Sequence, residues 1–222
     1  MLSELPLFKD FKEDDLKTLE ASLKIIRFKK KETIFSEGES PRWFYILLKG
    51  RVKISKLSSD GREIVLEIID SQDFFGALAV IKGFPYPANA IAVEDCEVAR
   101  IPSEIFLPLI VKYPNIEAQI LHHVTVRLKS GIESLKNIAL EDVSSRIAYQ
   151  LLKLANKYGK PLSEGVIIDL RITKQELAEM TGTTTETAIR VISKLKKMGY
   201  LSEINHKFII KDIRALAALF DG

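Results

Sequence analysis

The sequence predicts an α+β protein in which a strand-rich N-terminal part is followed by a helical C-terminal part. Short apolar runs separated by glycine turns fill residues 22–102, a pattern typical of a sandwich, roll or barrel. After Pro114 apolar residues recur every four positions, which indicates one helix of more than roughly 20 residues. Two short helices and a strand pair end the chain. We therefore expect three parts, residues 1–113, 114–141 and 142–222.

The composition favours a folded protein of the cytoplasm. The chain has 222 residues, 46% of them apolar, which is enough for a large core in one or two domains. It lacks an apolar run long enough to span a membrane, and its start lacks the basic-then-apolar order of a signal peptide. The single Cys96 excludes an internal disulfide and an all-cysteine metal cluster, and we expect it to be a small buried residue.

Four segments carry the strand signal most clearly. VKIS at 52–55 and EVARI at 97–101 alternate apolar and polar residues. WFYILLK at 43–49 and IVLEIID at 64–70 are β-rich runs. We expect these four strands to form the N-terminal roll.

The stretch FFGALAVIKGFPYPANA, residues 74–90, is unusually apolar for this chain. It carries one charge, Lys82, and its two glycines and two prolines prevent a single helix. Phe74, Phe84 and the residues around them either close over the roll as core or form the wall of a pocket. The residues leave both interpretations open.

The long helix carries one narrow apolar stripe. Its members are Ile116, Ile120, Val124 and Leu128, followed by Ile132, Leu135 and Ile138. A narrow stripe needs a partner, which is either the roll of the same chain or the same helix of a second copy. We expect a homodimer through Ile116, Ile120, Val124 and Leu128.

Charge is distributed unevenly along the chain. Residues 1–141 carry 20 basic and 21 acidic residues, a net −1, whereas residues 142–222 carry 13 and 9, a net +4. The C-terminal part is therefore the candidate for a polyanionic partner, although a soluble basic surface has the same charge.

Residues 173–201, TKQELAEMTGTTTETAIRVISKLKKMGYL, match the spacing of a helix-turn-helix. Thr173 with Glu176 forms a capping-box pattern, and Thr184 can cap the second helix. Gly182 follows small Ala178 where a tight turn needs a positive φ. The strands YLSEI and KFIIK then make the module a winged helix. An ordinary helical hairpin is the alternative.

The outer face of the second helix favours DNA binding over that alternative. Glutamate accepts a hydrogen bond from cytosine, arginine donates two to guanine, and threonine contacts a thymine methyl or a phosphate. We expect the DNA contacts to come from Thr173, Thr183, Thr184, Thr185, Glu186, Ile189, Arg190, Lys194, Lys196 and Lys197.

The order of these motifs resembles the CRP/FNR family of bacterial transcription regulators over nearly the whole chain. The resemblance implies an N-terminal β-roll of the cyclic-nucleotide-binding type, a long dimerisation helix and a C-terminal winged helix. It also implies that Glu186 and Arg190 read a G·C pair in each half of an inverted repeat in double-stranded DNA. RNA polymerase stays open as a further partner. Ile189 departs from the family, which often has a small residue there.

The resemblance also places the effector pocket, and the chain departs from the family there. Cyclic-nucleotide binders have Phe-Gly-Glu-Leu and then Arg-Ser-Ala or Arg-Thr-Ala, whereas this chain has Phe75-Gly76-Ala77-Leu78 and Tyr86-Pro87-Ala88. Both polar anchors are missing, and Gly131 and Ile132 stand where cAMP binders use Thr and Ser. We therefore expect no response to cAMP. The expected pocket residues are Phe75, Gly76, Ala77, Leu78, Tyr86, Pro87, Ala88, Val124, Arg127, Leu128 and Gly131.

Other sensors and other classes of protein stay as alternatives. Haem needs an axial ligand, for which His122 and His123 on the long helix are candidates, although polar residues on a helix flank are the commoner case. A roll-fold metal enzyme needs several histidines inside the roll, and residues 22–102 contain none. The winged helix argues against a regulatory subunit that binds only proteins. The chain is therefore not expected to be an enzyme.

Overall fold

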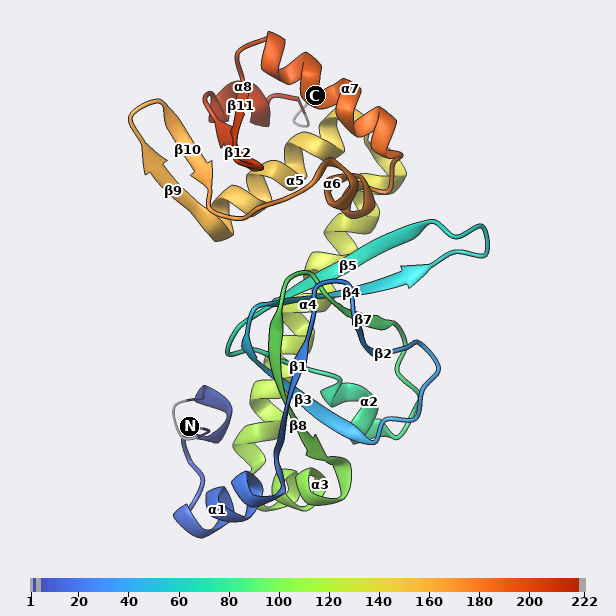
Figure 1. Cartoon of the computed structure of the whole chain (residues 1–222), viewed down its shortest axis with the longest axis vertical. Helices are drawn as coiled ribbons and strands as arrows, with labels where there is room; N and C mark the ends of the chain where they lie inside the picture. Colours follow the sequence, from blue (N-terminus) through green and yellow to red (C-terminus); the bar gives the residue numbers. More distant parts are fainter. Residues whose placement is uncertain (1, 3–4, 220–222) are drawn as a thin grey trace. The chain divides into compact units, whose positions relative to one another are not determined.

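A computed structural model describes residue 2 and residues 5–219, and the chain divides into two compact units (Figure 1). Unit 1 comprises residues 1–57 and 65–129, and unit 2 comprises residues 58–64 and 130–222. The long helix α4, Pro114–Leu140, is confirmed with 27 residues and begins in unit 1. None of the helices in the described part of the chain is long and apolar enough to cross a membrane.

Unit 1 is built on two four-stranded sheets, which confirms the predicted β-sandwich of the roll type. One sheet has the order β1 (Lys24–Phe28), β8 (Cys96–Pro102), β3 (Trp43–Lys49) and β6 (Phe74–Phe75). The other has the order β2 (Thr33–Phe35), β7 (Asn89–Ala92), β4 (Arg51–Leu57) and β5 (Glu63–Asp70). The four strands expected from the sequence are β3, β4, β5 and β8.

Strand β3 explains how the two sides of its sheet are filled. Side chains alternate along a strand, so Phe44 and Ile46 face one core cluster while Tyr45 and Leu47 face another. All four are at most 5% exposed. A strand buried on both faces accounts for the continuous apolar run WFYILLK.

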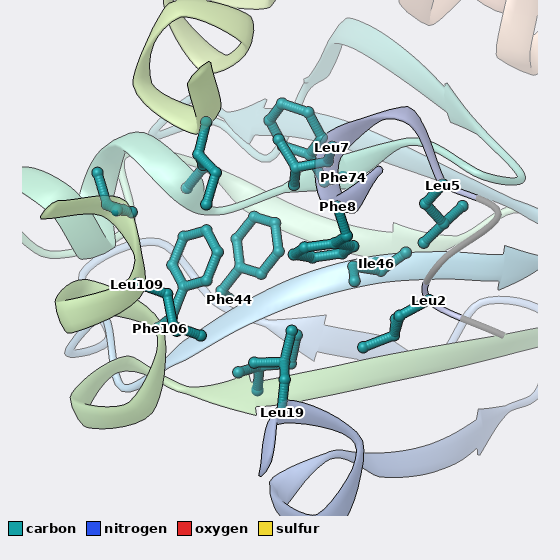
Figure 2. Packing of buried hydrophobic residues seen from close by; sticks show 14 of the residues in the cluster. Leu2, Leu5, Leu7, Phe8, Leu19, Phe44, Ile46, Phe74, Phe106 and Leu109 are labelled. Atoms are coloured by element: carbon teal, nitrogen blue, oxygen red, sulfur yellow. The ribbon is translucent and has the colours of Figure 1, made fainter. Parts of the chain in front are cut away.

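The first core cluster lies between this sheet and the helices of unit 1 (Figure 2). The rings of Phe44 and Phe106 stack with centroids 4.0 Å apart, and Phe8 and Leu19 pack around them. Phe106 belongs to α3 (Ser103–Lys112), Leu19 to α1 (Glu13–Ser22), and Phe8 to the short 3-10 helix η2 (Pro6–Phe8). These three helices were not predicted from the sequence.

Unit 2 packs helices against a small sheet. The helices are α5 (Val143–Tyr158), α6 (Lys174–Thr181), α7 (Thr185–Lys197) and α8 (Ile213–Ala217). The sheet order is β11 (Leu201–Ile204), β12 (Lys207–Ile210), β10 (Gly165–Ile168) and β9 (Gly159–Leu162). The core forms where the apolar face of α5, with Ile147 and Leu151 fully buried, meets α6, α7 and β12.

The apolar run VIIDLRI, residues 166–172, continues beyond strand β10, which ends at Ile168. Beyond it the backbone N–H of Ile172 donates to the carbonyl of His206, and Leu170 and Ile172 turn into the core. The apolar residues of the segment are therefore explained by burial and not by continued strand pairing.

Candidate DNA-binding surface and effector region

The helix-turn-helix of unit 2 has the caps and the turn that the sequence predicts. The Thr173 hydroxyl accepts from the Glu176 N–H, and the Glu176 carboxylate accepts from the Thr173 N–H. Gly182 has a φ of 61°, in the left-handed region that favours glycine. The Thr184 hydroxyl accepts from the Thr187 N–H at the start of α7. These bonds satisfy helix N-terminal donors that would otherwise lack partners.

Helix α7 has one buried face and one exposed face. Ala188, Val191, Ile192 and Leu195 are buried in the core of unit 2. On the other side the exposed side chains include most of the expected DNA contacts, namely Thr184, Thr185, Glu186, Ile189, Arg190, Lys194, Lys196 and Lys197, while Thr173 is exposed at the start of α6 and Thr183 is half-buried.

Some basic side chains on this surface have an acidic partner within the described part of the chain and others do not. The side chains of Arg190 and Lys197 form no hydrogen bond or ion pair with the described residues. The Lys196 ammonium, by contrast, lies 2.6 Å from the Glu203 carboxylate on β11. Sequence reasoning missed Glu203, because a pairing between a helix and a strand of the wing depends on the tertiary fold.

The wing, formed by β11 and β12, is a tight hairpin. Strands β11 and β12 pair from Leu201↔Ile210 to Ile204↔Lys207. Asn205 and His206 form the two-residue turn and both have positive φ, 50° and 61°. This is the backbone of the two-residue turns that match the twist of a hairpin.

In unit 1 the apolar stretch 74–90 contributes mainly to the core. Phe75 and Tyr86 lie inside the roll, where the Tyr86 ring stacks on Phe35 at 3.9 Å. The Tyr86 hydroxyl donates to the carbonyl of Trp43 at 2.6 Å and accepts from the Trp43 N–H at 3.2 Å. Burial raises the pKa of the Tyr86 hydroxyl. The position that carries the family's arginine is thus a packed, hydrogen-bonded tyrosine.

The other expected pocket residues lie in different surroundings. Ala77, on α2 (Ala77–Lys82), belongs to the first core cluster, whereas Phe75 belongs to the interior of the roll. Gly76 has a φ of 77°, and a Cβ there would lie 3.2 Å from the Tyr86 ring. Ala88 is buried, Val124 and Arg127 are half-buried, and Leu78, Pro87, Leu128 and Gly131 are exposed. Tyr86 lines a cavity of about 340 Å³ with Trp43, Tyr45, Glu39, Ser40 and Arg42.

Arg127 is engaged by its own unit. Its guanidinium lies 2.8 Å from Glu67 and 3.2 Å from Asp73, and it donates to the carbonyl of Phe74 at 2.9 Å. These contacts fix α4 to β5 and to the turn before β6. Three acceptors of unit 1 thus hold the guanidinium.

The two helical histidines differ in their surroundings. His123 Nδ1 lies 3.6 Å from Asp73, and its ring packs on Phe74 with centroids 4.8 Å apart. His122 is exposed. Both line a hollow of about 440 Å³ beside Pro6 and Asn115. The described residues contain no group of three or more histidine, cysteine or acidic side chains that could hold a metal ion.

Helix α4 requires one correction. Ile116 and Ile120 are 1% and 3% exposed because they pack in the first core cluster of their own chain, and Val124 is half-buried against it. The prediction that Ile116 and Ile120 face a second copy was therefore wrong. Leu128 is 62% exposed. The exposed large apolar residues of α4 are Leu121, Val126, Leu128, Ile132, Leu135 and Leu140.

Comparisons with known proteins agree with this architecture. The family model of the cyclic nucleotide-binding domain matches residues 25–113, and that of the Crp-like helix-turn-helix domain matches residues 145–219. A CRP-like cAMP-activated global transcriptional regulator of Mycobacterium tuberculosis is 26% identical over 217 residues, covering 98% of this chain and 97% of the relative. A global nitrogen regulator of Synechocystis is 28% identical over 195 residues, covering 87% of each chain.

A solved structure shares the fold. The c-di-GMP-responsive global regulator of Xanthomonas campestris superposes with a TM-score of 0.79 at 24% identity, covering 90% of this chain and 100% of the other. A roll of the cyclic-nucleotide-binding type, a long helix and a helix-turn-helix together define a transcription regulator that binds DNA. The chain belongs to the CRP/FNR family of these regulators, and its relatives are regulators and not enzymes.

Proposed function

We propose that the protein is a homodimeric regulator that reads an inverted repeat in double-stranded DNA through α7 and does not respond to cAMP. The exposed face of α7 is the observation that carries the proposal. It presents Glu186 and Arg190 one helical turn apart near the N-terminal end, with the free Lys197 further along. A mobility shift on pooled random duplexes tests DNA binding directly, because a module that recognises only proteins would leave the duplexes unshifted.

The residues of this surface divide into base contacts and phosphate contacts according to the hydrogen bonds that each can make. Glu186 and Arg190 read base edges in the major groove, where arginine donates twice to guanine. Thr173, Thr184 and Thr185 lie at the N-terminal ends of α6 and α7, where backbone N–H groups and the helix dipole favour a phosphate. Thr183 and Ile189 flank the contacted bases. The resemblance suggests a half-site with a TGA-like core.

The dimer forms along a stripe of α4 that shares only Leu128 with the interface expected from the sequence. Leu121, Leu128 and Leu135 are seven residues apart, and Thr125 and Ile132 lie between them with the spacing of a heptad repeat. All five are exposed. Leucine at one seam position with β-branched residues at the other favours two parallel helices. Ile116, Ile120 and Val124 pack on the roll of their own chain, which leaves this heptad seam for the second copy.

The expected absence of a cAMP response follows from the lack, among the described residues, of a free cation that could pair with a phosphate inside the roll. A buried phosphate needs a paired cation, and desolvating it without one costs several kcal/mol. Ala77 and Tyr86 supply no such charge, and Arg127 is already held by Glu67 and Asp73. The names of the relatives, one cAMP-activated and one c-di-GMP-responsive, show that the effector varies among similar chains.

Calorimetric titration with cAMP and cGMP tests this part of the proposal. We expect affinity at least about a hundredfold weaker than that of a cyclic-nucleotide-binding family member, because two polar anchors are missing and each tenfold corresponds to about 1.4 kcal/mol. Micromolar binding of cAMP that also tightens DNA binding would contradict it.

Haem is the second candidate effector. The observation that favours it is the hollow of about 440 Å³ that both His122 and His123 line. A neutral imidazole is a common haem ligand. A Soret band in the purified protein that disappears in a His123→Ala variant supports this candidate, and a protein that takes up no haem when it is supplied rules it out.

A further inference from the structure

The carboxylate of Glu203 is the acidic centre of the basic DNA-binding module. Glu203 lies on β11 of the wing, and its side chain is only 11% exposed. Lys174 of α6 forms an ion pair with one carboxylate oxygen, and Lys196 of α7 lies 2.6 Å from the other. One acidic side chain therefore connects the wing to both helices of the helix-turn-helix.

The two lysines favour the ionised form of Glu203. Burial alone raises the pKa of Glu203, but the hydrogen bonds from Lys174 and Lys196 outweigh burial and lower the pKa below its ordinary value. Each lysine is held where its ammonium would otherwise be free to meet a DNA phosphate. The arrangement neutralises one of the two positive charges and restrains both side chains.

The cluster lies among the groups proposed to contact DNA. Lys174 directly follows Thr173, the cap of α6, and Lys196 directly precedes the unpaired Lys197. His206 at the tip of the wing has its Nδ1 atom 4.0 Å from Glu203, and its carbonyl accepts from the N–H of Ile172. A carboxylate at this place repels a DNA phosphate. A neutral or basic residue here would therefore give a higher affinity for DNA.

We propose that Glu203 is a positioning residue that limits the phosphate-based, sequence-independent affinity for DNA by withholding Lys174 and Lys196 from phosphates. This proposal rests on the proposed function of α7. Non-specific affinity comes from phosphate neutralisation, and each phosphate contact contributes about −0.9 to the slope of log affinity against log salt. Occupying two lysines internally lowers binding to all sequences while the base-reading Arg190 stays free.

The first test is a Glu203→Gln variant of the full chain, titrated with a mixed-sequence duplex by fluorescence anisotropy between 50 and 200 mM salt, concentrations over which such slopes are resolved. Glutamine keeps the shape of the side chain and removes its charge. We expect tighter binding to the mixed-sequence duplex and a slope steeper by about 0.9 for each lysine released. A folded Glu203→Gln protein with the wild-type slope and affinity overturns the proposal.

A second pair of variants does not depend on whether Glu203→Gln folds. Lys196→Met and Lys197→Met remove neighbouring charges from the same end of α7, one paired and one free. We expect Lys197→Met to reduce the steepness of the slope by about 0.9 and Lys196→Met to leave it unchanged. A loss of about 0.9 on Lys196→Met means that Lys196 contacts phosphate and overturns the proposal. If Lys197→Met and Arg190→Ala both leave DNA binding intact, the proposed DNA surface itself is wrong.

Discussion

At the scale of single residues, Tyr86 is a packed and hydrogen-bonded part of the interior of the roll. It occupies the position at which the family resemblance places a phosphate-binding arginine, yet its ring stacks on Phe35 and its hydroxyl bonds the backbone of Trp43. A side chain with these contacts stabilises the roll without a bound ligand. Tyr86 is therefore a core residue at the position where the resemblance places a ligand anchor.

The contribution of Tyr86 to stability can be measured. Tyr86→Phe removes the hydroxyl and leaves the backbone N–H and carbonyl of the half-buried Trp43 without this partner. We expect the free energy of unfolding to fall by about 1–3 kcal/mol, the usual cost of leaving a buried polar group unsatisfied. Urea denaturation monitored by circular dichroism measures the change. An unchanged midpoint would show that water replaces the hydroxyl.

Arg190 carries the second prediction at this scale. Arg190→Ala should weaken binding to the preferred sequence by about 1–3 kcal/mol and relax the preference at one G·C pair in each half-site. Anisotropy titrations on the preferred duplex and on a mixed-sequence duplex measure the two effects separately. An equal loss on both duplexes would identify Arg190 as a phosphate contact.

Among single residues, the sequence identified those whose role depends on local spacing. The caps Thr173 and Thr184 and the turn residue Gly182 were predicted correctly because their hydrogen bonds and φ are decided within a few residues. Glu203 and the partners of Arg127 were missed because they lie on other elements. No local pattern indicates which carboxylate a lysine or an arginine will meet after folding.

At the scale of elements, α4 carries two sets of apolar residues, one buried and one exposed. The every-four set Ile116, Ile120 and Val124 packs on the roll, and the heptad set around Leu121 and Leu128 is exposed. The length and position of the helix could be predicted from its periodicity. The sequence did not show which set packs on the roll and which is exposed, because the members of the two sets are neighbours in sequence and both sets recur with a helical period.

The heptad seam gives the prediction for this element. Leu128→Glu places a charge in the proposed dimer interface and should produce monomers, whereas Val126→Glu places the same charge on the opposite side of α4 and should leave the dimer intact. Light scattering measures the mass of each variant. A Leu128→Glu protein that stays dimeric while Val126→Glu dissociates would move the interface to the other face.

At the scale of the whole molecule, both units contain carboxylates whose pKa is lowered by their partners. In unit 2 the hydrogen bonds from Lys160 and Lys207 lower the pKa of Asp169 to about 2, and the N–H of Ser145 lowers that of Asp142. In unit 1 Lys112 and Tyr113 lower the pKa of Asp15. Their ionised forms are thus favoured in the folded state.

The lowered pKa values predict the direction of the pH dependence. A group with a lowered pKa contributes stability above its ordinary pKa, near 4, and loses that contribution as the pH falls through the folded value. We expect stability to be level near neutral pH and to decline between about pH 4 and 2, measured by thermal melting across this range. Asp169→Asn should reduce the loss of stability with falling pH near pH 2, where Asp169 titrates in the folded protein. Stability that increases on acidification would contradict the assignment.

The central claim is that a symmetric dimer reads an inverted repeat through α7. Sequencing the duplexes that the wild-type protein recovers from a random pool tests it most directly. We predict an enriched inverted repeat whose half-site centres lie about one helical turn, or 10–10.5 base pairs, apart. Recovery of no common sequence, or of a single half-site without its inverted copy, would contradict the claim.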